Sequence, residues 1–271
     1  MNQISSLRAA ALGLAVLFIM SGCGNQTTEP LNDGGGTVVL EFDNVVGPQE
    51  LVLSGPSYVN ATGESFTVTT CRYFISNVVL HRQDGALYTI PQDSSYFLVD
   101  EAVAASHLAT LSKIPAGTYT SISFMIGVDS LRSASDVSRR TGVLDPGAAA
   151  ADMYWVWNSG YIFMKLEGSS PAAPEAPSGE RMFRYHVGGF GGIAPTPTIN
   201  NIRTVRLSIP GEGMKVQRDK KTTMHLLADI MRIFDATPNV SIAANPTVML
   251  APFSSTIADN YATMFSVDHV H

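Results

Sequence analysis

The chain has 271 residues, a formal net charge of −6 at pH 7, and charged side chains at only 15% of its positions. This acidic balance disfavours nucleic acid and anionic lipid surfaces as partners, because both attract clusters of Lys and Arg. The length is enough to bury one sizeable core, so we expect a single folded domain.

The N-terminal segment has the order of a bacterial lipoprotein signal. Arg8 supplies positive charge, residues 9–20 form an unbroken apolar run, and small residues precede Cys23. The run is too short to span a bilayer as a permanent helix. We therefore expect residues 1–22 to be removed and the Cys23 thiol to receive a diacylglyceryl group, which anchors the protein in the cell envelope. Gly24 at the next position fits sorting to the outer membrane, facing the periplasm or the cell surface. The alternative is an ordinary cleaved signal with an incidental cysteine.

Residues 23–36 are polar and rich in glycine, which is typical of a flexible tether. The folded domain is expected over residues 37–271. Once Cys23 is acylated, Cys71 is the remaining cysteine, so no intrachain disulfide can form. We expect Cys71 to be a small core residue rather than a reactive thiol.

Apolar and polar residues alternate with a period of two along most of the domain, and Gly, Pro, Asn and Asp separate the alternating segments. The segments are residues 37–42, 65–70, 72–81, 119–126, 181–187, 202–209 and 224–230. Many short alternating strands with frequent turn signals predict an all-β fold, an antiparallel β-sandwich with Greek-key-like connections.

Helical spacing is rare. Residues 102–111 are compatible with a short helix, and residues 255–265 carry apolar side chains at helical spacing behind a Ser cap. Residues 169–179, rich in Pro, Ala, Ser and Gly, read as a surface loop between two strands. The prediction is therefore a sandwich with one or two short helices.

The usual enzyme signatures are missing from the sequence. There is no GxSxG elbow, phosphate-binding loop, HExxH motif or dinucleotide fingerprint. The glycine-rich residues 188–192 do not join a strand to a helix, so they do not predict phosphate binding. We expect a protein that is not an enzyme.

Both tryptophans of the chain lie in residues 153–157. In a strand, Met153, Trp155 and Trp157 would point to one face. Two interpretations stay open: the aromatic side chains fill the core of the sandwich, or they line a pocket.

The histidines form the second notable group. His186 lies beside the glycine-rich turn, and His269 and His271 share one face of an extended segment, where they can offer two imidazoles to one metal ion. The alternative for this pair is a frayed, solvated tail. His225 alternates with apolar Met224 and Leu226 and should face away from them, as a surface or structural residue.

Six motifs, in this order along the chain, resemble the MbnP-like copper-binding family over nearly all of the domain. They are residues 72–77 (RYFISN), 126–130 (IGVDS), 142–146 (GVLDP), 153–168 (MYWVWNSGYIFMKLEG), 183–189 (FRYHVGG) and 257–269 (IADNYATMFSVDH). The resemblance implies a secreted β-rich domain that binds copper, expected as Cu(I).

In the better-understood members of this family, a partner diheme enzyme of the cytochrome c peroxidase type oxidises tryptophan to kynurenine, which then contributes to a copper site with histidine imidazoles. Carried onto this chain, the resemblance makes Trp155 or Trp157 the kynurenine precursor. It makes His186 and His269 metal ligands, with His271 as a further ligand and Met153 as a soft neighbour.

Two functions from different classes follow. The first is a lipoprotein that binds copper for storage, scavenging or delivery. The second is a metal-free surface module that binds a protein or a glycan. Tryptophans lining a pocket with histidines would favour the first function, and tryptophans buried among aliphatic side chains would favour the second.

Overall fold

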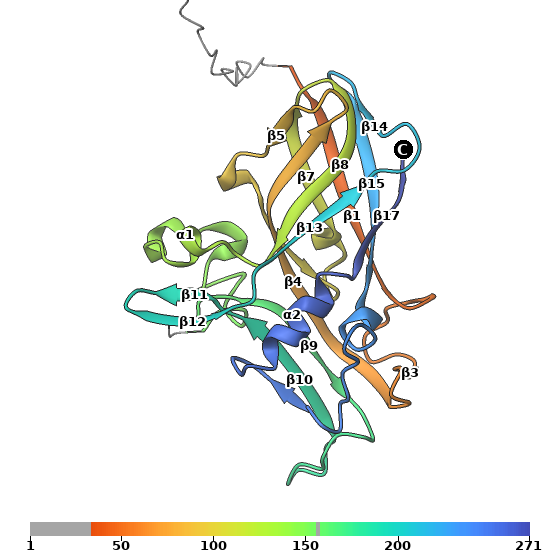
Figure 1. Cartoon of the computed structure of the whole chain (residues 1–271), viewed down its shortest axis with the longest axis vertical. Coiled ribbons are helices and arrows are strands. Elements are labelled where there is room, and N and C mark those ends of the chain that lie inside the picture. Colours follow the sequence, from red (N-terminus) through yellow and green to blue (C-terminus); the bar gives the residue numbers. More distant parts are fainter. Residues whose placement is uncertain (1–33, 156–157) are drawn as a thin grey trace, which may run out of the picture. The chain divides into compact units, whose positions relative to one another are not determined.

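The computed structural model describes residues 34–155 and 158–271, which belong to one compact unit (Figure 1). The signal at residues 1–22, the lipidation site Cys23, most of the tether, and Trp157 lie outside the described residues. Among the residues described, no helix is both long and apolar enough to cross a membrane.

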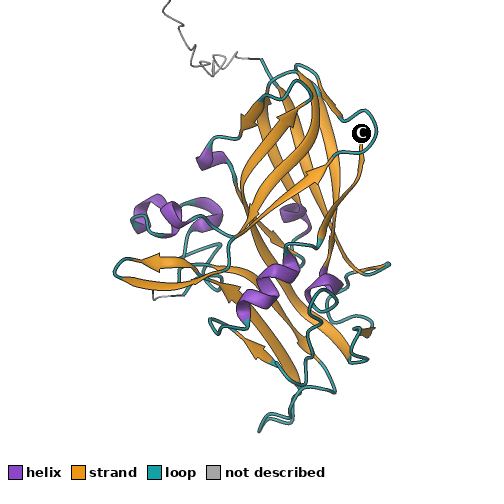
Figure 2. Cartoon of the chain, viewed as in Figure 1, coloured by secondary structure: helices purple, strands orange, loops and turns teal. Residues whose placement is uncertain are grey.

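The structure is dominated by strands, as the period-two pattern predicts (Figure 2). The first of two large sheets has the strand order β17-β15-β1-β2, with β7 also pairing with β1. Its strands are β1 (Gly36–Val46), β2 (Gln49–Glu50), β7 (Leu108–Ile114), β15 (Lys221–Asp229) and β17 (Phe265–Val270). Strands β1 and β15 run parallel, and they place Glu41 opposite His225.

The second sheet is built around the long strand β4 (Ser65–Arg82) and has the order β13-β8-β4-β9-β10-β16. Its other strands are β3 (Tyr58–Val59), β5 (Leu87–Thr89), β6 (Tyr96–Asp100), β8 (Gly117–Ile126), β9 (Ile162–Ser169), β10 (Met182–Gly188), β13 (Arg203–Ser208), β14 (Met214–Val216) and β16 (Thr247–Val248). Strands β11 (Phe190–Ile193) and β12 (Thr196–Asn200) form a separate hairpin.

Aromatic side chains join the two large sheets into a sandwich. The Phe42 ring on β1 packs edge-on against Phe124 on β8 and Tyr73 on β4, with ring centroids 6.4 and 6.2 Å apart. Phe265 on β17 packs against the same three rings. Each buried aromatic side chain contributes about 1.5–3 kcal/mol through the area it removes from water, so this group fixes β17 to the core.

Helices are short. The α-helices are α1 (Ser130–Ser133) and α2 (Ser254–Tyr261), and the 3₁₀ helices are η1 (Gln92–Ser94), η2 (Ala104–His107), η3 (Val137–Arg139), η4 (Gly142–Leu144) and η5 (Ile230–Ile233). The helix predicted over residues 255–265 is confirmed by α2, which ends earlier. The helix predicted over residues 102–111 is largely wrong: only η2 is helical there, and the alternating residues after it form β7.

The predicted β-sandwich is confirmed, with two parallel pairings, β1 with β15 and β10 with β16, among otherwise antiparallel ones. The segments predicted at 65–70 and 72–81 are one continuous strand, β4, whose pairing with its neighbours shifts at several bulges. A bulge inserts an unpaired residue and so interrupts the strict alternation that the sequence pattern assumes.

Candidate metal centre

Strand β17 holds the last residues of the chain firmly against β15. Its Val267 and Val270 pack on the core. Beyond the strand, the His271 N–H donates to the Thr223 carbonyl at 3.0 Å, and the Thr223 N–H donates to the His271 carbonyl at 2.8 Å. The frayed tail considered for His269 and His271 is therefore wrong, because both the backbone and the apolar face of this segment have partners.

A β-bulge sets the direction of the side chains on β17. Leu226 lies opposite Val267 and Met224 lies opposite Val270, so the register shifts by one residue between the two pairs. His225 consequently faces the two residues Asp268 and His269. A bulge redirects side chains in this way, and here it brings both polar side chains to the outer face of the sheet.

His225 points away from the core, as its alternation with apolar neighbours predicts. Met224 and Leu226 are fully buried, whereas the His225 side chain keeps 17% of its surface exposed. His269 and His271 lie on the same outer face of the sheet as His225. The alternation was therefore interpreted correctly, and the structure adds that His225 contacts two other histidines on this face.

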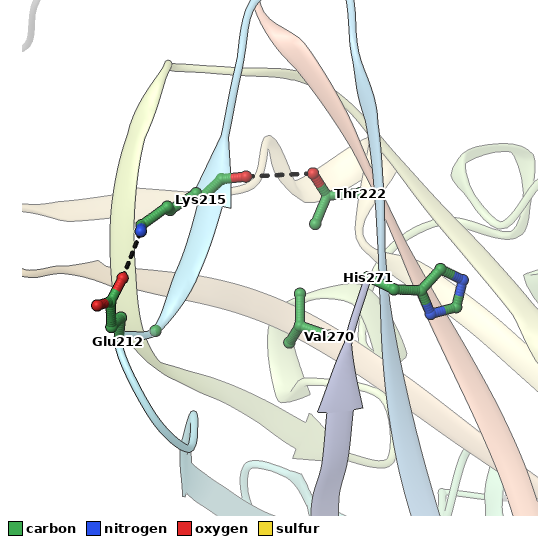
Figure 3. Close-up of a pocket in the computed structure, with 6 residues that line it drawn as sticks. Glu212, Lys215, Thr222, Val270 and His271 are labelled. Atoms are coloured by element: carbon green, nitrogen blue, oxygen red, sulfur yellow. Dashed lines mark hydrogen bonds and ion pairs between the residues drawn. The ribbon is translucent and has the colours of Figure 1, made fainter.

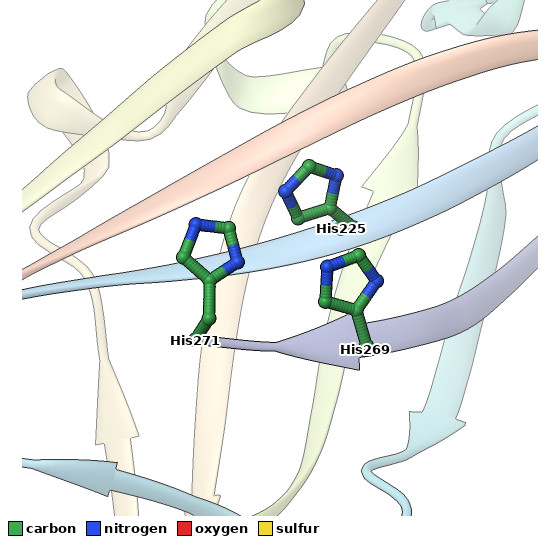
Figure 4. A group of neighbouring side chains, drawn as sticks. All are labelled: His225, His269 and His271. Atoms are coloured by element: carbon green, nitrogen blue, oxygen red, sulfur yellow. The ribbon is translucent and has the colours of Figure 1, made fainter.

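Three imidazoles gather on this outer face (Figure 4). The rings of His225 and His269 stack with centroids 4.3 Å apart and an interplanar angle of 11°; His271 lies 5.1 Å from His225 and 5.5 Å from His269. One nitrogen from each of the three rings lies within 4.8 Å of the others. We call His225, His269 and His271 the histidine triad.

Carboxylates contact two of the three imidazoles, His225 and His269. The Nδ1 atom of His225 lies 3.2 Å from Asp43 Oδ2, and its Nε2 atom lies 3.4 Å from Glu41 Oε2. His269 Nδ1 lies 2.8 Å from Asp268 Oδ2. A carboxylate on a single ring nitrogen, as at His269, fixes which nitrogen carries the proton, and such partners commonly orient metal-binding histidines.

The triad can act as a set of nitrogen donors for a borderline or soft metal ion. Imidazole suits copper, zinc, nickel and iron. A metal–imidazole bond of about 2.0–2.1 Å lies in the plane of the ring, so two stacked rings cannot both reach one ion. One of the rings must rotate out of the stack for the triad to close on a metal. His269 has the freedom to do so, because half of its side-chain surface is exposed.

His186 does not join this group, which corrects the prediction that it shares a site with His269. It lies on β10 in the other large sheet, where its Nε2 atom is 2.7 Å from Glu167 Oε1 on the neighbouring strand β9. The Thr70 hydroxyl donates to the other oxygen of the same carboxylate at 3.2 Å. In this structure His186 is one member of a polar cluster on the β4-β9-β10 face.

The tryptophan segment is also separate from the triad. The strand predicted over residues 153–157 is wrong for its described part, where Tyr154 makes a single bridge to Tyr161. Trp155 and Met153 are buried in a second hydrophobic cluster with Phe74, Phe163 and other residues, so Met153 is not a neighbour of His269. Burial of Trp155 is the arrangement expected of a metal-free module, so the histidines alone support a metal site. The Trp155 indole packs against Gly188, where an added Cβ would lie 2.7 Å from the ring.

The remaining histidines have local partners. His81 Nε2 lies 2.8 Å from the Ser123 hydroxyl, and His107 Nε2 lies 3.5 Å from Glu101 Oε2. His225 is the site residue that the sequence interpretation missed, and its only sequence signal was an outward position on a strand.

A hollow of about 270 Å³ lies beside His271 at the end of β17 (Figure 3). Of the three histidines, only His271 lines it; the other lining residues are Glu212, Gly213, Lys215, Thr222 and Val270. The Lys215 ammonium is paired with the Glu212 carboxylate. The hollow therefore gives solvent access beside His271 but does not enclose the three imidazoles.

Comparison with known proteins places the chain by family and fold. The family described as MbnP matches residues 35–250, and this match ends before β17. The solved structure of MbnP from Methylosinus trichosporium is similar to the chain with a TM-score of 0.53 at 18% identity, covering 80% of this chain and 82% of that one. No curated protein matches the chain. The family match spans most of the sequence, and the chain therefore belongs to the MbnP family.

Proposed function

We propose that this protein binds copper at the histidine triad, as a lipid-anchored protein of the cell envelope. The observation that carries the proposal is the meeting of His225, His269 and His271 on one outer face of the five-stranded sheet. Three imidazoles, from β15, from β17 and from the residue that follows β17, form a donor set that copper accepts. Membership of the MbnP family, which is linked to copper, supports the choice of metal.

Other donors are poorly placed to compete with the triad. Cys71 is fully buried, and burial raises the pKa of its thiol far above the usual range, so it stays protonated. Met224, the methionine next to His225 in sequence, faces the core. The imidazoles of the triad are exposed by comparison, and an ion held there can be exchanged with solvent or with another protein.

Exposure favours storage, scavenging or delivery over catalysis. His269 keeps 53% of its side-chain surface exposed, and His225 keeps 17%. A site for turnover usually excludes water around the reacting atoms, whereas a site that hands its ion to a partner must be reachable. We therefore propose a non-enzymatic role, with attachment to the outer membrane through Cys23.

A modified tryptophan would form a second donor set elsewhere on the sandwich. The Trp155 indole lies on Gly188, two residues after His186 on β10. Conversion of Trp155 to kynurenine by a diheme enzyme of the cytochrome c peroxidase type would put an aniline nitrogen and a carbonyl near that strand. Trp157 lies outside the described residues, so only the sequence resemblance supports it as an alternative precursor of kynurenine.

Titration calorimetry of the mature protein in detergent tests the triad. We expect copper to bind the wild type tightly, and we expect His225→Ala, His269→Ala and His271→Ala each to weaken binding at least about tenfold, as loss of a metal-orienting or ligating group does. His81→Ala, on the other sheet, is the matched control and should bind like the wild type. Equal affinities across all five proteins would reject the triad, and no binding by any would favour a metal-free interaction module.

A further inference from the structure

The strand register places Glu41 beside His225 of the triad. Strands β1 and β15 run parallel with Glu41 directly opposite His225. Phe42, the next residue on β1, points into the core, so Glu41 points to the outer face. Its Oε2 atom lies 3.4 Å from His225 Nε2, and about a third of its side-chain surface is exposed.

The two nitrogens of His225 face different carboxylates. Nδ1 lies 3.2 Å from Asp43, and when this nitrogen carries the ring proton it donates to that carboxylate. The lone pair of Nε2 then faces Glu41 Oε2, and two acceptors oppose each other. A cation between these two atoms would remove their repulsion and gain a ligand from each.

We propose that Glu41 is an oxygen ligand of the metal bound at the histidine triad, and that it makes the site selective for divalent ions, Cu²⁺ and Zn²⁺, over Cu⁺. The inference rests on the proposed function, because it assigns a further ligand to the same site. It also changes the oxidation state expected from Cu(I) to Cu(II).

The donor chemistry supports a divalent ion. Carboxylate oxygen is a hard donor, and zinc and Cu²⁺ accept mixed sets of imidazole and carboxylate, whereas Cu⁺ prefers imidazole, thiolate and thioether. Neither group of potential metal ligands among the described residues includes a cysteine. One carboxylate ligand also neutralises half of the charge of a divalent ion, while it would leave a Cu⁺ site with no net charge to attract the nearby Asp43 and Asp268.

The second group of close ligand atoms, formed by Glu41, Asp43 and His225, shares His225 with the triad. We assign Asp43 the role of orienting the His225 ring through Nδ1, as Asp268 does for His269. Glu41 differs from both, because it faces the nitrogen that is left to bind metal. The three carboxylates therefore have distinct effects on binding that substitutions can separate.

The test compares Glu41→Gln with Glu50→Gln, which makes the same change of charge on β2 of the same sheet. Both variants and the wild type are titrated with Zn²⁺, with Cu²⁺, and with Cu⁺ under anaerobic conditions against a chromophoric chelator. We expect Glu41→Gln to weaken Zn²⁺ and Cu²⁺ binding at least about tenfold, with Cu⁺ changed less than about threefold. Glu50→Gln should match the wild type for all three ions.

Electron paramagnetic resonance of the Cu²⁺-loaded proteins gives a second readout. Replacement of a carboxylate ligand should change the copper hyperfine splitting in Glu41→Gln and leave Glu50→Gln unchanged. Wild-type affinities and spectra in Glu41→Gln, or an equal loss for Cu⁺, would overturn the assignment of Glu41 while leaving the triad in place. Failure of the wild type to bind any of the three ions would overturn the proposed function as well.

Discussion

The imidazole rings of His225 and His269 stack 4.3 Å apart on neighbouring strands, with His225 on β15 and His269 on β17. The bulge opposite His225 produces this contact, because it allows both Val267 and Val270 to face the core. The histidine triad thus depends on how β17 packs against the core and pairs with β15, and a change in that packing should disturb the site.

Removing the aromatic anchor of β17 should weaken both the fold and the site. Phe265→Ala deletes a ring that packs on Phe42, Tyr73 and Phe124, with centroids 5.1 to 6.1 Å away. Truncation of a buried Phe costs about 3–5 kcal/mol. We expect urea denaturation to show that the free energy of unfolding falls by about 3–5 kcal/mol. Calorimetry should show weaker copper binding. A variant as stable as the wild type would contradict the packing described for Phe265.

Loss of a carboxylate beside a ring nitrogen should also lower the metal affinity. Asp268→Asn removes the charged partner 2.8 Å from His269 Nδ1. Loss of such an orienting partner costs about 10–100-fold in metal affinity. We expect copper titration to show a decrease in this range with unchanged thermal stability. Unchanged affinity would mean that Asp268 does not orient His269 in the bound state.

Glu64 should make stability depend on pH. Burial raises the pKa of its carboxyl, but hydrogen bonds from Asn60, the backbone of Ala243 and Ile242, and Ser241 outweigh burial and lower the pKa to about 2 from 4.5. A carboxyl whose pKa is lower in the folded protein than in the unfolded chain stabilises the fold at any pH above the unfolded pKa. This contribution is lost as the pH falls from 4.5 toward 2.

The measurement is the unfolding midpoint of wild type and Glu64→Gln as a function of pH. We expect the wild type to be more stable at pH 7 and the difference to shrink steadily below pH 4.5. A difference that stays constant from pH 7 to pH 3 would show that the ionised carboxylate does not hold the loop at residues 241–243.

Gly188 should tolerate no side chain. A Cβ at this position would lie 2.2 Å from the Tyr161 carbonyl oxygen and 2.7 Å from the Trp155 ring. Overpacking of this kind costs about 1–3 kcal/mol. We expect Gly188→Ala to lower the free energy of unfolding and to change tryptophan fluorescence. Unchanged fluorescence together with wild-type stability would contradict the contact between the indole and β10.

The anchor can be tested by fractionation. Cys23 follows the apolar run of the signal, and its thiol is the expected site of acylation. We expect Cys23→Ala to move the protein from the membrane fraction to the soluble fraction. Retention of the variant in the membrane fraction would show that another segment holds it there.

The seven alternating segments all fall on strands, namely β1, β4, β8, β10, β13 and β15. The two faces of each of these strands meet different surroundings, and period-two alternation records that difference. The sequence did not predict the parallel pairing of β1 with β15, because the two strands are far apart in sequence and alternation carries no information about neighbours. The tryptophan segment was misread as a strand because its bulky residues favour strands, yet there Met153 and Trp155 pack into a second hydrophobic cluster, against Phe74 of β4 and Phe163 of β9.

The candidate site was half predictable. The spacing of His269 and His271 placed two imidazoles on one face, and the structure keeps them together. His225 joins them only through the pairing of β15 with β17, and His186 is excluded because β10 belongs to the other sheet. Alternation says which way a side chain points, whereas the sheet order decides which side chains meet.

The position of bound copper can be located by diffraction data collected at the copper absorption edge from crystals of copper-loaded protein. We expect one strong anomalous peak within bonding distance of His225, His269 and His271, with Glu41 beside it. A peak beside His186 and Trp155, with none at the triad, would contradict this expectation.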